Sequence, residues 1–223
     1  MSTDVVHEGR LDPAAACILP RAVSTAAIRS GQGVSWGAHD HRLYCGVAAF
    51  YRNGYRASLV SEWLPALDGV MGKLMIGAKV ADVGCGHGHS TVLMAKAFPK
   101  SRFWGFDAHE GSINAARHHA EEAGVADRVT FEVAKAESYP AQGYDLICFF
   151  DCLHDMGDPV GASSHIHEAL AADGAWLIVE PFAGNTVADN LNPVGRIFYG
   201  ASTMICTPAS LDQEVGLALG AQA

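Results

Sequence analysis

From Lys79 onward, short apolar runs alternate with segments of helical periodicity, and this alternation constrains the fold more than any other feature. Five runs have the length and composition of strands: 79–84, 102–107, 129–134, 144–151 and 174–180. The first of them, KVADVG, is almost continuously apolar, as expected of a strand that is buried on both faces. Strands separated by helices are typical of a parallel sheet under two helical layers. The pattern predicts an α/β, doubly wound sheet.

Helix signals occupy the intervals between these runs. Residues 90–98 are apolar and end at Pro99, residues 110–124 close with a glycine, and Asp158-Pro159 is typical of a helix start. These three segments predict the crossover helices of the sheet.

The flanking segments also contain helical patterns. The Ala-rich stretch 12–29 predicts one or two short helices, and apolar residues at helical spacing predict another over 55–67. Asn192-Pro193 begins a further predicted helix, whose inward positions are Val194, Ile197, Phe198, Ala201 and Ile205. Residues 207–223 are rich in small side chains and contain no strand pattern.

Composition limits the class of protein. At 223 residues, 49% hydrophobic and 17% charged, the chain can bury one sizeable core and is not disordered. The net charge of −9 and the lack of a Lys/Arg stripe argue against a nucleic-acid partner. No apolar run is long enough to span a membrane, and Met1–Arg10 lacks the apolar region of a signal peptide. We therefore expect a cytoplasmic protein.

The six cysteines are scattered, without the paired spacing of a disulfide framework or a zinc site. Cys148, Cys152 and His154 are close in sequence, which raises the alternative of a metal site. They lie in a buried-strand pattern, where a free cysteine behaves as a small hydrophobic residue. We expect reduced structural thiols and no metal.

The segment 80–88, VADVGCGHG, carries the chemistry. A buried strand contains Asp82 near its end, and three alternate glycines (Gly84, Gly86 and Gly88) then open a helix. Glycines let the backbone turn tightly and approach a ligand closely. In a doubly wound sheet, that ligand lies beyond the carboxyl ends of the strands.

The spacing indicates which ligand to expect. A dinucleotide fingerprint is GxGxxG, whereas this loop is GxGxG and follows a carboxylate that suits a cationic ligand. Asp107 ends the second predicted strand, where an acid can bind the two hydroxyls of a ribose. Together these features describe S-adenosylmethionine and disfavour a nicotinamide-dependent oxidoreductase. The alternative is that the glycines form only a tight turn.

Three segments, VADVGCGHGHST, GFDAHEGSINAAR and YDLICFFDCLHDMGDP, resemble the principal motifs of class I S-adenosylmethionine-dependent methyltransferases. The similarity covers about residues 75–182. GVSW, SEWLPAL and CLHDMGDPVGA further resemble bacterial proteins that join a winged-helix-like domain to such a methyltransferase domain. This resemblance implies a Rossmann-like fold, S-adenosyl-L-methionine as methyl donor and S-adenosyl-L-homocysteine as product.

The resemblance also implies roles for individual residues. The expected cofactor-binding residues are Asp82, Gly84, Cys85, Gly86, Gly88, Asp107, Ala108, Ala136, Glu137 and Asp151. His154 follows the fourth strand and is the candidate base, because its ordinary pKa near neutrality suits proton removal. The alternative is that His154 and Asp155 only bond the loop backbone or help to hold the methionine end of the cofactor. Trp36 and Phe198 fit either an acceptor pocket or the core.

The chain also departs from the family pattern. Lys135 and Glu137 stand where many relatives carry an Asp that bonds adenine, and the final β-hairpin of the family is missing from the sequence pattern. The polypeptide therefore looks shortened at both ends. We interpret 1–53 as a helical or irregular remnant of a winged-helix-like domain, 54–206 as the methyltransferase domain and 207–223 as a tail.

These observations predict methyl transfer to an oxygen or nitrogen atom of a small-molecule acceptor. We expect no nucleic-acid or membrane partner and leave room for a homodimer. One alternative is a regulatory domain that binds S-adenosylmethionine or a metabolite without turnover. Another is a shortened chain that binds little and aggregates through an uncovered edge strand.

Overall fold

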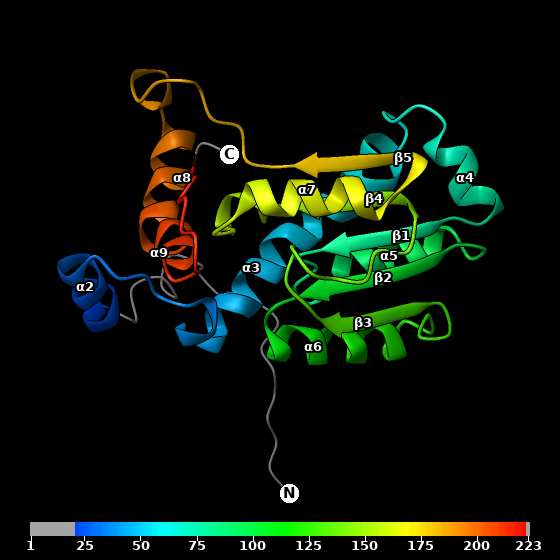
Figure 1. The fold of residues 1–223 in the computed structure, drawn as a ribbon, viewed down its shortest axis with the longest axis horizontal. Helices are drawn as coiled ribbons and strands as arrows, with labels where there is room; N and C mark the ends of the chain where they lie inside the picture. Colours follow the sequence, from blue (N-terminus) through cyan, green and yellow to red (C-terminus); the bar gives the residue numbers. More distant parts are fainter. Residues whose placement is uncertain (1–20, 222–223) are drawn as a thin grey trace, which may run out of the picture.

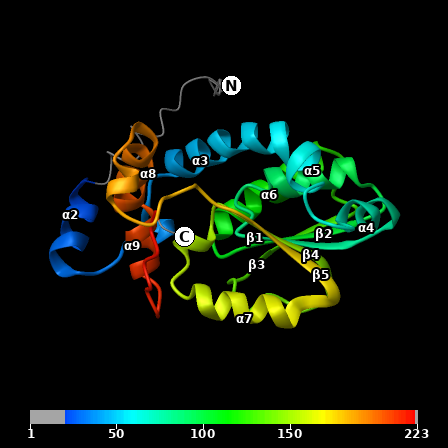
Figure 2. The same ribbon diagram turned by 90° about the horizontal axis from the view of Figure 1, so that it is seen from above.

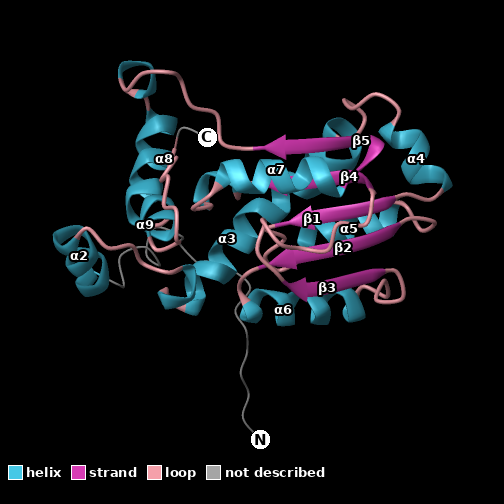
Figure 3. Cartoon of the chain, viewed as in Figure 1, coloured by secondary structure: helices cyan, strands magenta, loops and turns pink. Residues whose placement is uncertain are grey.

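The computed structural model describes residues 21–221, which form a five-stranded parallel sheet with helices on both faces (Figures 1 and 3). The strands are β1 (Lys79–Val83), β2 (Arg102–Asp107), β3 (Val129–Val133), β4 (Tyr144–Phe150) and β5 (Leu170–Val179). Their order is β3-β2-β1-β4-β5, and every neighbouring pair is parallel. The predicted α/β, doubly wound fold is confirmed. β5 begins before the predicted residue 174 because α7 runs into it without a loop.

One core cluster of buried side chains lies on each face of the sheet, between the strands and the helices that Figure 2 shows on either side. The helices involved are α4 (Val70–Ile76), α5 (His89–Ala97) and α6 (Glu110–Glu122) on one face, and α7 (Pro159–Ala169) on the other. Successive strand side chains point to opposite faces. Val80 therefore packs in the cluster of α5 and α6, and its neighbour Ala81 packs in the cluster of α7 with Ile166.

The described chain before β1 is helical. It comprises α2 (Arg21–Ser30), the 3₁₀-helix η1 (Trp36–Ala38), α3 (His41–Gly54) and the π-helix η2 (Tyr55–Trp63). The predicted helix over 55–67 is present as η2, shortened and continuous with α3, and it buries Leu59 completely. The expected boundary between residues 53 and 54 therefore falls inside one helical run. The predicted helical residues 12–20 lie outside the described part of the chain.

After β5 the chain forms η4 (Ala188–Asn190), α8 (Pro193–Met204) and α9 (Cys206–Leu211), and residues 180–221 contain no strand. The predicted inward face of α8 is wrong at two positions, since Val194 is 57% and Ile197 68% exposed. Ile205, just after α8, is buried against Leu43 of α3. The described chain contains no layer that covers the outer side of α8.

All five strands point toward the end of the molecule where α2, α8 and α9 lie (Figure 1). The tail residues join the N-terminal segment there, because Val34 N donates a hydrogen bond to Pro208 O at 2.9 Å. Helices from both ends of the chain therefore form a cap beyond the sheet. Within residues 21–221, every helix is too short or too polar to cross a lipid bilayer.

Candidate functional site

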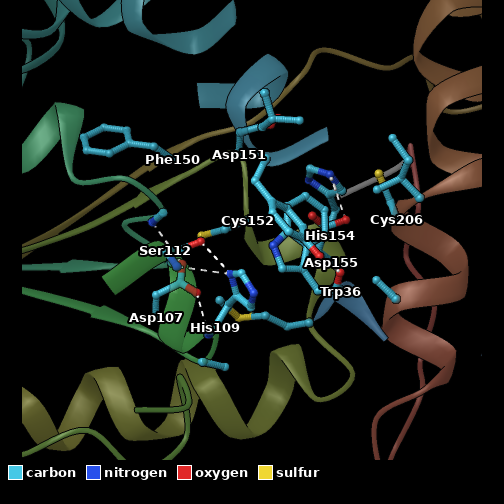
Figure 4. A pocket seen from close by; sticks show the side chains of 18 of the residues that line it. Trp36, Asp107, His109, Ser112, Phe150, Asp151, Cys152, His154, Asp155 and Cys206 are labelled. Carbon is cyan, nitrogen blue, oxygen red and sulfur yellow. Dashed lines mark hydrogen bonds and ion pairs between the residues drawn. The ribbon is translucent and has the colours of Figure 1, made fainter. Parts of the chain in front are cut away.

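A cleft of about 1120 Å³ lies between the carboxyl ends of the strands and this helical cap (Figure 4). Many of the predicted site residues line it: Gly84, Cys85, Gly86, Asp107, Ala108, Ala136, Glu137, Asp151 and His154. Asp82 and Gly88 do not line the cleft. The sequence motifs therefore converge on one cavity, and contact with a ligand stays a prediction for each residue.

Asp82 lies beneath the glycine loop. Its side chain points to the same face as Val80, toward α5, where Oδ2 accepts hydrogen bonds of 2.6 Å from Ser90 and Thr91. The residue is 1% exposed, and burial raises its pKa to about 6 against the opposing effect of these hydroxyls. In this orientation Asp82 ties β1 to α5, and it does not face a cationic ligand in the cleft as the sequence suggested.

The three glycines of the loop all have left-handed backbone angles, with φ of 71°, 51° and 73° for Gly84, Gly86 and Gly88. A Cβ on Gly88 would lie 2.6 Å from Phe131 Cζ, and one on Gly84 would lie 2.7 Å from Cys152 Sγ. These two glycines allow close packing within the protein. A Cβ on Gly86 would meet no atom within 4 Å, so this glycine faces open space in the cleft.

Asp107, at the end of β2, anchors the loop from the cleft side. Its Oδ2 accepts a hydrogen bond from Gly86 N at 2.9 Å, and its Oδ1 accepts one from His109 N at 2.8 Å (Figure 4). Burial raises the pKa of Asp107, while these two backbone donors oppose the shift. Each carboxylate oxygen keeps a second lone pair for a ligand hydroxyl.

An aromatic wall beside Asp107 was not identified from the sequence. Trp36 packs on Tyr44 with ring centroids 5.5 Å apart, and Tyr44 packs on His109 at 4.6 Å. The Tyr44 hydroxyl is fixed by donation to Trp36 O and His39 O. All three side chains line the cleft, so the N-terminal helices supply part of the site. The only sequence signal was Trp36, which fitted either core or pocket.

The opposite end of the cleft is acidic. Asp151 follows β4 with a φ of 56°, a left-handed angle that is strained for a residue with a side chain. Its Oδ1 is buried without a hydrogen-bond partner in the described chain. Burial raises the pKa of Asp151 to about 7, against the opposing effects of the Tyr51 hydroxyl and His154. Asp151 therefore lines the cleft, while its unpartnered oxygen is itself buried.

His154 is held between acids. Its Nδ1 lies 2.5 Å from Glu180 Oε2, and its Nε2 lies 3.4 Å from Asp155 Oδ1. Burial alone lowers the pKa of His154, but hydrogen bonds with Cys206 and Glu180 and the nearby carboxylates together raise it to about 11. The near-neutral pKa that favoured His154 as a base is therefore absent in these surroundings.

Glu180 holds this arrangement from behind. Its Oε1 accepts hydrogen bonds from Cys152 N at 3.1 Å and Leu153 N at 2.8 Å, while its Oε2 is hydrogen-bonded to Nδ1 of His154. From the sequence, this acid had no assigned role. Its position at the end of β5, next to β4, brings it beside the loop that carries His154.

The cysteines that raised a metal alternative do not meet. Cys148 is fully buried in β4, and Cys152 Sγ donates to Val83 O at 3.2 Å. Both behave as the structural thiols that the sequence predicted. Cys206, at the start of α9, instead lies beside His154 and Asp155. No sequence signal placed it there, because it is more than fifty residues further along the chain.

Comparison with known proteins identifies the family. The model of a family described as "Methyltransferase domain" matches residues 76–209, which is more than half of the chain. The chain belongs to this methyltransferase family, and its resemblance to class I S-adenosylmethionine-dependent methyltransferases is confirmed. The match spans the whole sheet, α8 and part of α9.

Individual relatives carry methyltransferase names. The chain is 28% identical over 143 residues to 27-O-demethylrifamycin SV methyltransferase of Amycolatopsis mediterranei, covering 63% of this chain and 44% of that protein. It is 26% identical over 129 residues to a ubiquinone biosynthesis O-methyltransferase of Ruegeria sp., covering 58% and 49%. The matches thus span less than half of each relative.

The fold is shared with solved structures. The mitomycin 7-O-methyltransferase MmcR superposes with a TM-score of 0.64 at 16% identity, covering 84% of this chain and 56% of MmcR. At this identity the likeness shows the fold alone.

Proposed function

We propose that the chain is an S-adenosylmethionine-dependent methyltransferase that acts on an oxygen or nitrogen atom of a small molecule. The observation that carries this proposal is the loop at Gly86, which faces open cleft space while its backbone N–H is fixed by Asp107. A ligand can approach the backbone closely here, and a carboxylate with free lone pairs lies beside it.

The residues of the cleft fit this cofactor. Asp107 is placed to accept hydrogen bonds from the ribose hydroxyls, and the wall of Tyr44 and His109 is placed to enclose the nucleoside. Ala136 and Glu137 line the adenine end, where packing and the backbone replace the missing Asp of the family pattern. When bound, S-adenosylmethionine supplies an electrophilic methyl group on a positively charged sulfur.

The remaining volume and chemistry of the cleft support a small acceptor. The cleft of about 1120 Å³ is slightly larger than a typical ligand cavity, and Tyr51, Phe50 and Phe198 line it between α3 and α8. The names of the two curated relatives favour an oxygen acceptor. Asp151, whose carboxyl group lines the cleft, is the group placed to accept a proton from such an acceptor.

Calorimetric titration with S-adenosyl-L-homocysteine tests the proposal. We expect saturable binding by the native chain and an affinity about 10- to 100-fold lower in Asp107→Asn, which loses charge-assisted hydrogen bonds. Asp127→Asn is the matched control, because Asp127 is 72% exposed and lies outside the cleft. Absence of binding by folded native protein, or equal affinity in Asp107→Asn, would contradict the proposed site.

A further inference from the structure

Three potential metal ligands meet at the acidic end of the cleft. His154 and Asp155 belong to η3 (Leu153–Asp155), which follows β4, and Cys206 begins α9. Their ligand atoms all lie within 4.8 Å of one another, and all three side chains line the cleft. Figure 4 shows the three together on the side toward α8, away from Asp107. The fold thus gathers an imidazole, a carboxylate and a thiol at one point.

The two nitrogens of His154 have different partners. Nδ1 and Glu180 Oε2 are 2.5 Å apart, a hydrogen-bond separation that leaves no room for an ion between them. Glu180 is itself fixed by two backbone donors, so the ring orientation is determined. A carboxylate on one imidazole nitrogen is the usual support for a histidine that ligates metal through its other nitrogen.

The other nitrogen has the spacing of a ligand pair. His154 Nε2 and Asp155 Oδ1 lie 3.4 Å apart. Two atoms that each lie about 2.0–2.1 Å from a tetrahedral ion are about 3.4 Å from one another. Asp155 Oδ1 is also buried without a hydrogen-bond partner in the described chain. The distance between these two atoms is longer than a good hydrogen bond and equals the distance expected between two ligand atoms of a tetrahedral ion.

The charge around these atoms is unbalanced. Asp151, Asp155 and Glu180 surround one imidazole. Among the described residues that line the cleft there is no arginine, and the single lysine, Lys135, follows β3. Buried carboxylates are stabilised by pairing or by coordination to a metal. A divalent cation at this point supplies the missing positive charge.

We propose that His154 Nε2, Asp155 Oδ1 and Cys206 Sγ bind a Zn²⁺ ion. Nitrogen, sulfur and oxygen ligands together select zinc rather than magnesium or calcium. Three protein ligands leave a fourth position, which opens into the cleft as in zinc sites that act on a substrate.

The role of the ion rests on the proposed function, whereas its binding does not. A Zn²⁺ ion held by these three residues would lower the pKa of a hydroxyl acceptor in its fourth position, and the proton would pass to Asp151, which lies beside His154. The acceptor oxygen then forms a bond to the methyl carbon as the bond from that carbon to sulfur breaks. The sulfonium becomes a neutral thioether, and no oxidant or reductant is required.

Titration of the chelator-stripped full chain with Co²⁺, followed by absorption spectroscopy, tests the site. We expect one equivalent to produce tetrahedral visible bands and a thiolate charge-transfer band, and Zn²⁺ to displace them. Cys206→Ser should remove the charge-transfer band, and Glu180→Gln should weaken binding about tenfold while the band remains. Cys45→Ser is the matched control, because Cys45 is exposed on α3 and should change nothing.

The outcomes are decisive in both directions. No saturable Co²⁺ binding, or a charge-transfer band that survives in Cys206→Ser, overturns the zinc site. If Cys206→Ser does not fold, alkylation of the native chain replaces it, since saturating Zn²⁺ should protect Cys206 from iodoacetamide. Alkylation of Cys206 at the same rate with and without Zn²⁺ would also overturn the site. Binding of S-adenosyl-L-homocysteine to the metal-free chain is measured separately. Failure of the proposed function can therefore be distinguished from failure of the metal site.

Discussion

Gly86 and Gly88 are two residues apart in one loop, yet they meet opposite surroundings. Both have positive φ, but only a Cβ on Gly88 would collide with Phe131 and Ala116. The environment of Gly86 is open cleft. The same motif therefore combines a glycine needed for packing with a glycine that leaves room for a ligand.

Alanine substitutions should separate these two roles. We expect Gly88→Ala to lower the free energy of unfolding by about 2–4 kcal/mol, because strain and overpacking add. Gly86→Ala should cost only about 1–2 kcal/mol from its backbone angle. It should nevertheless weaken S-adenosyl-L-homocysteine binding more than Gly88→Ala does. Urea unfolding and calorimetry measure both quantities; the reverse ranking of either would contradict these assignments.

Asp82 makes a prediction about pH. Its folded-state pKa of about 6 lies above the ordinary value of 3.8, so the folded chain holds more protons between these values. Stability contributed by the neutral carboxyl is present at low pH and is lost as pH rises through about 6. Asp82→Asn stays neutral and still accepts from Ser90 and Thr91.

The native chain should therefore lose on the order of 3 kcal/mol relative to Asp82→Asn between about pH 4 and pH 7. Urea unfolding of both proteins across this range measures the difference. Parallel pH profiles for the two proteins would show that burial of the Asp82 charge does not control stability in this way.

At the scale of elements, the strands and the start of α8 were predictable from the sequence, whereas α3 and α9 were not. Each strand is an apolar run bounded by turn residues, which marks it without reference to any partner. The apolar side chains of α3 that line the cleft range from buried to exposed, since Leu43 is 1% and Phe50 58% exposed. A helix that divides its apolar residues in this way has no single periodic face.

The position of the cleft was predictable from the sequence, whereas some of the residues that form it were not. Strand ends and the glycine loop located the cleft, because parallel strands bring their carboxyl ends together. The face of the sheet to which Asp82 points follows from its position two residues after Val80, because residues two apart in a strand point to the same face. Glu180 and Cys206 could not be found, since their positions depend on the register of β5 and on the fold of the cap.

The exposed side of α8 carries an element-scale prediction. Val194→Ser should change the free energy of unfolding by less than about 0.5 kcal/mol, because Val194 is 57% exposed and lies outside the cleft. Ile205→Ala, which empties a buried position, should cost about 2–4 kcal/mol. Equal losses from both changes, measured by urea unfolding, would mean that α8 is covered in solution.

At the scale of the whole molecule, the cleft is lined by both the sheet and the helical cap. The sheet supplies Gly86, Asp107 and Asp151, and the cap supplies Tyr44 and Cys206. A ligand that touches both parts binds only the folded arrangement and therefore stabilises it.

Saturation with S-adenosyl-L-homocysteine should consequently raise the midpoint of thermal unfolding. At a concentration about 100 times the dissociation constant, the shift should be about 5–10 °C for a chain of this size. Asp107→Asn at the same ligand concentration serves as the control and should shift by much less. A shift of equal size in the variant would contradict binding through Asp107.

A crystal structure of the chain with S-adenosyl-L-homocysteine tests the central claim most directly. The account predicts the ribose hydroxyls on the carboxylate of Asp107 and the amino-acid part of the ligand against the backbone at Gly86. A ligand bound elsewhere, or a cleft that stays empty at saturating ligand, would contradict it.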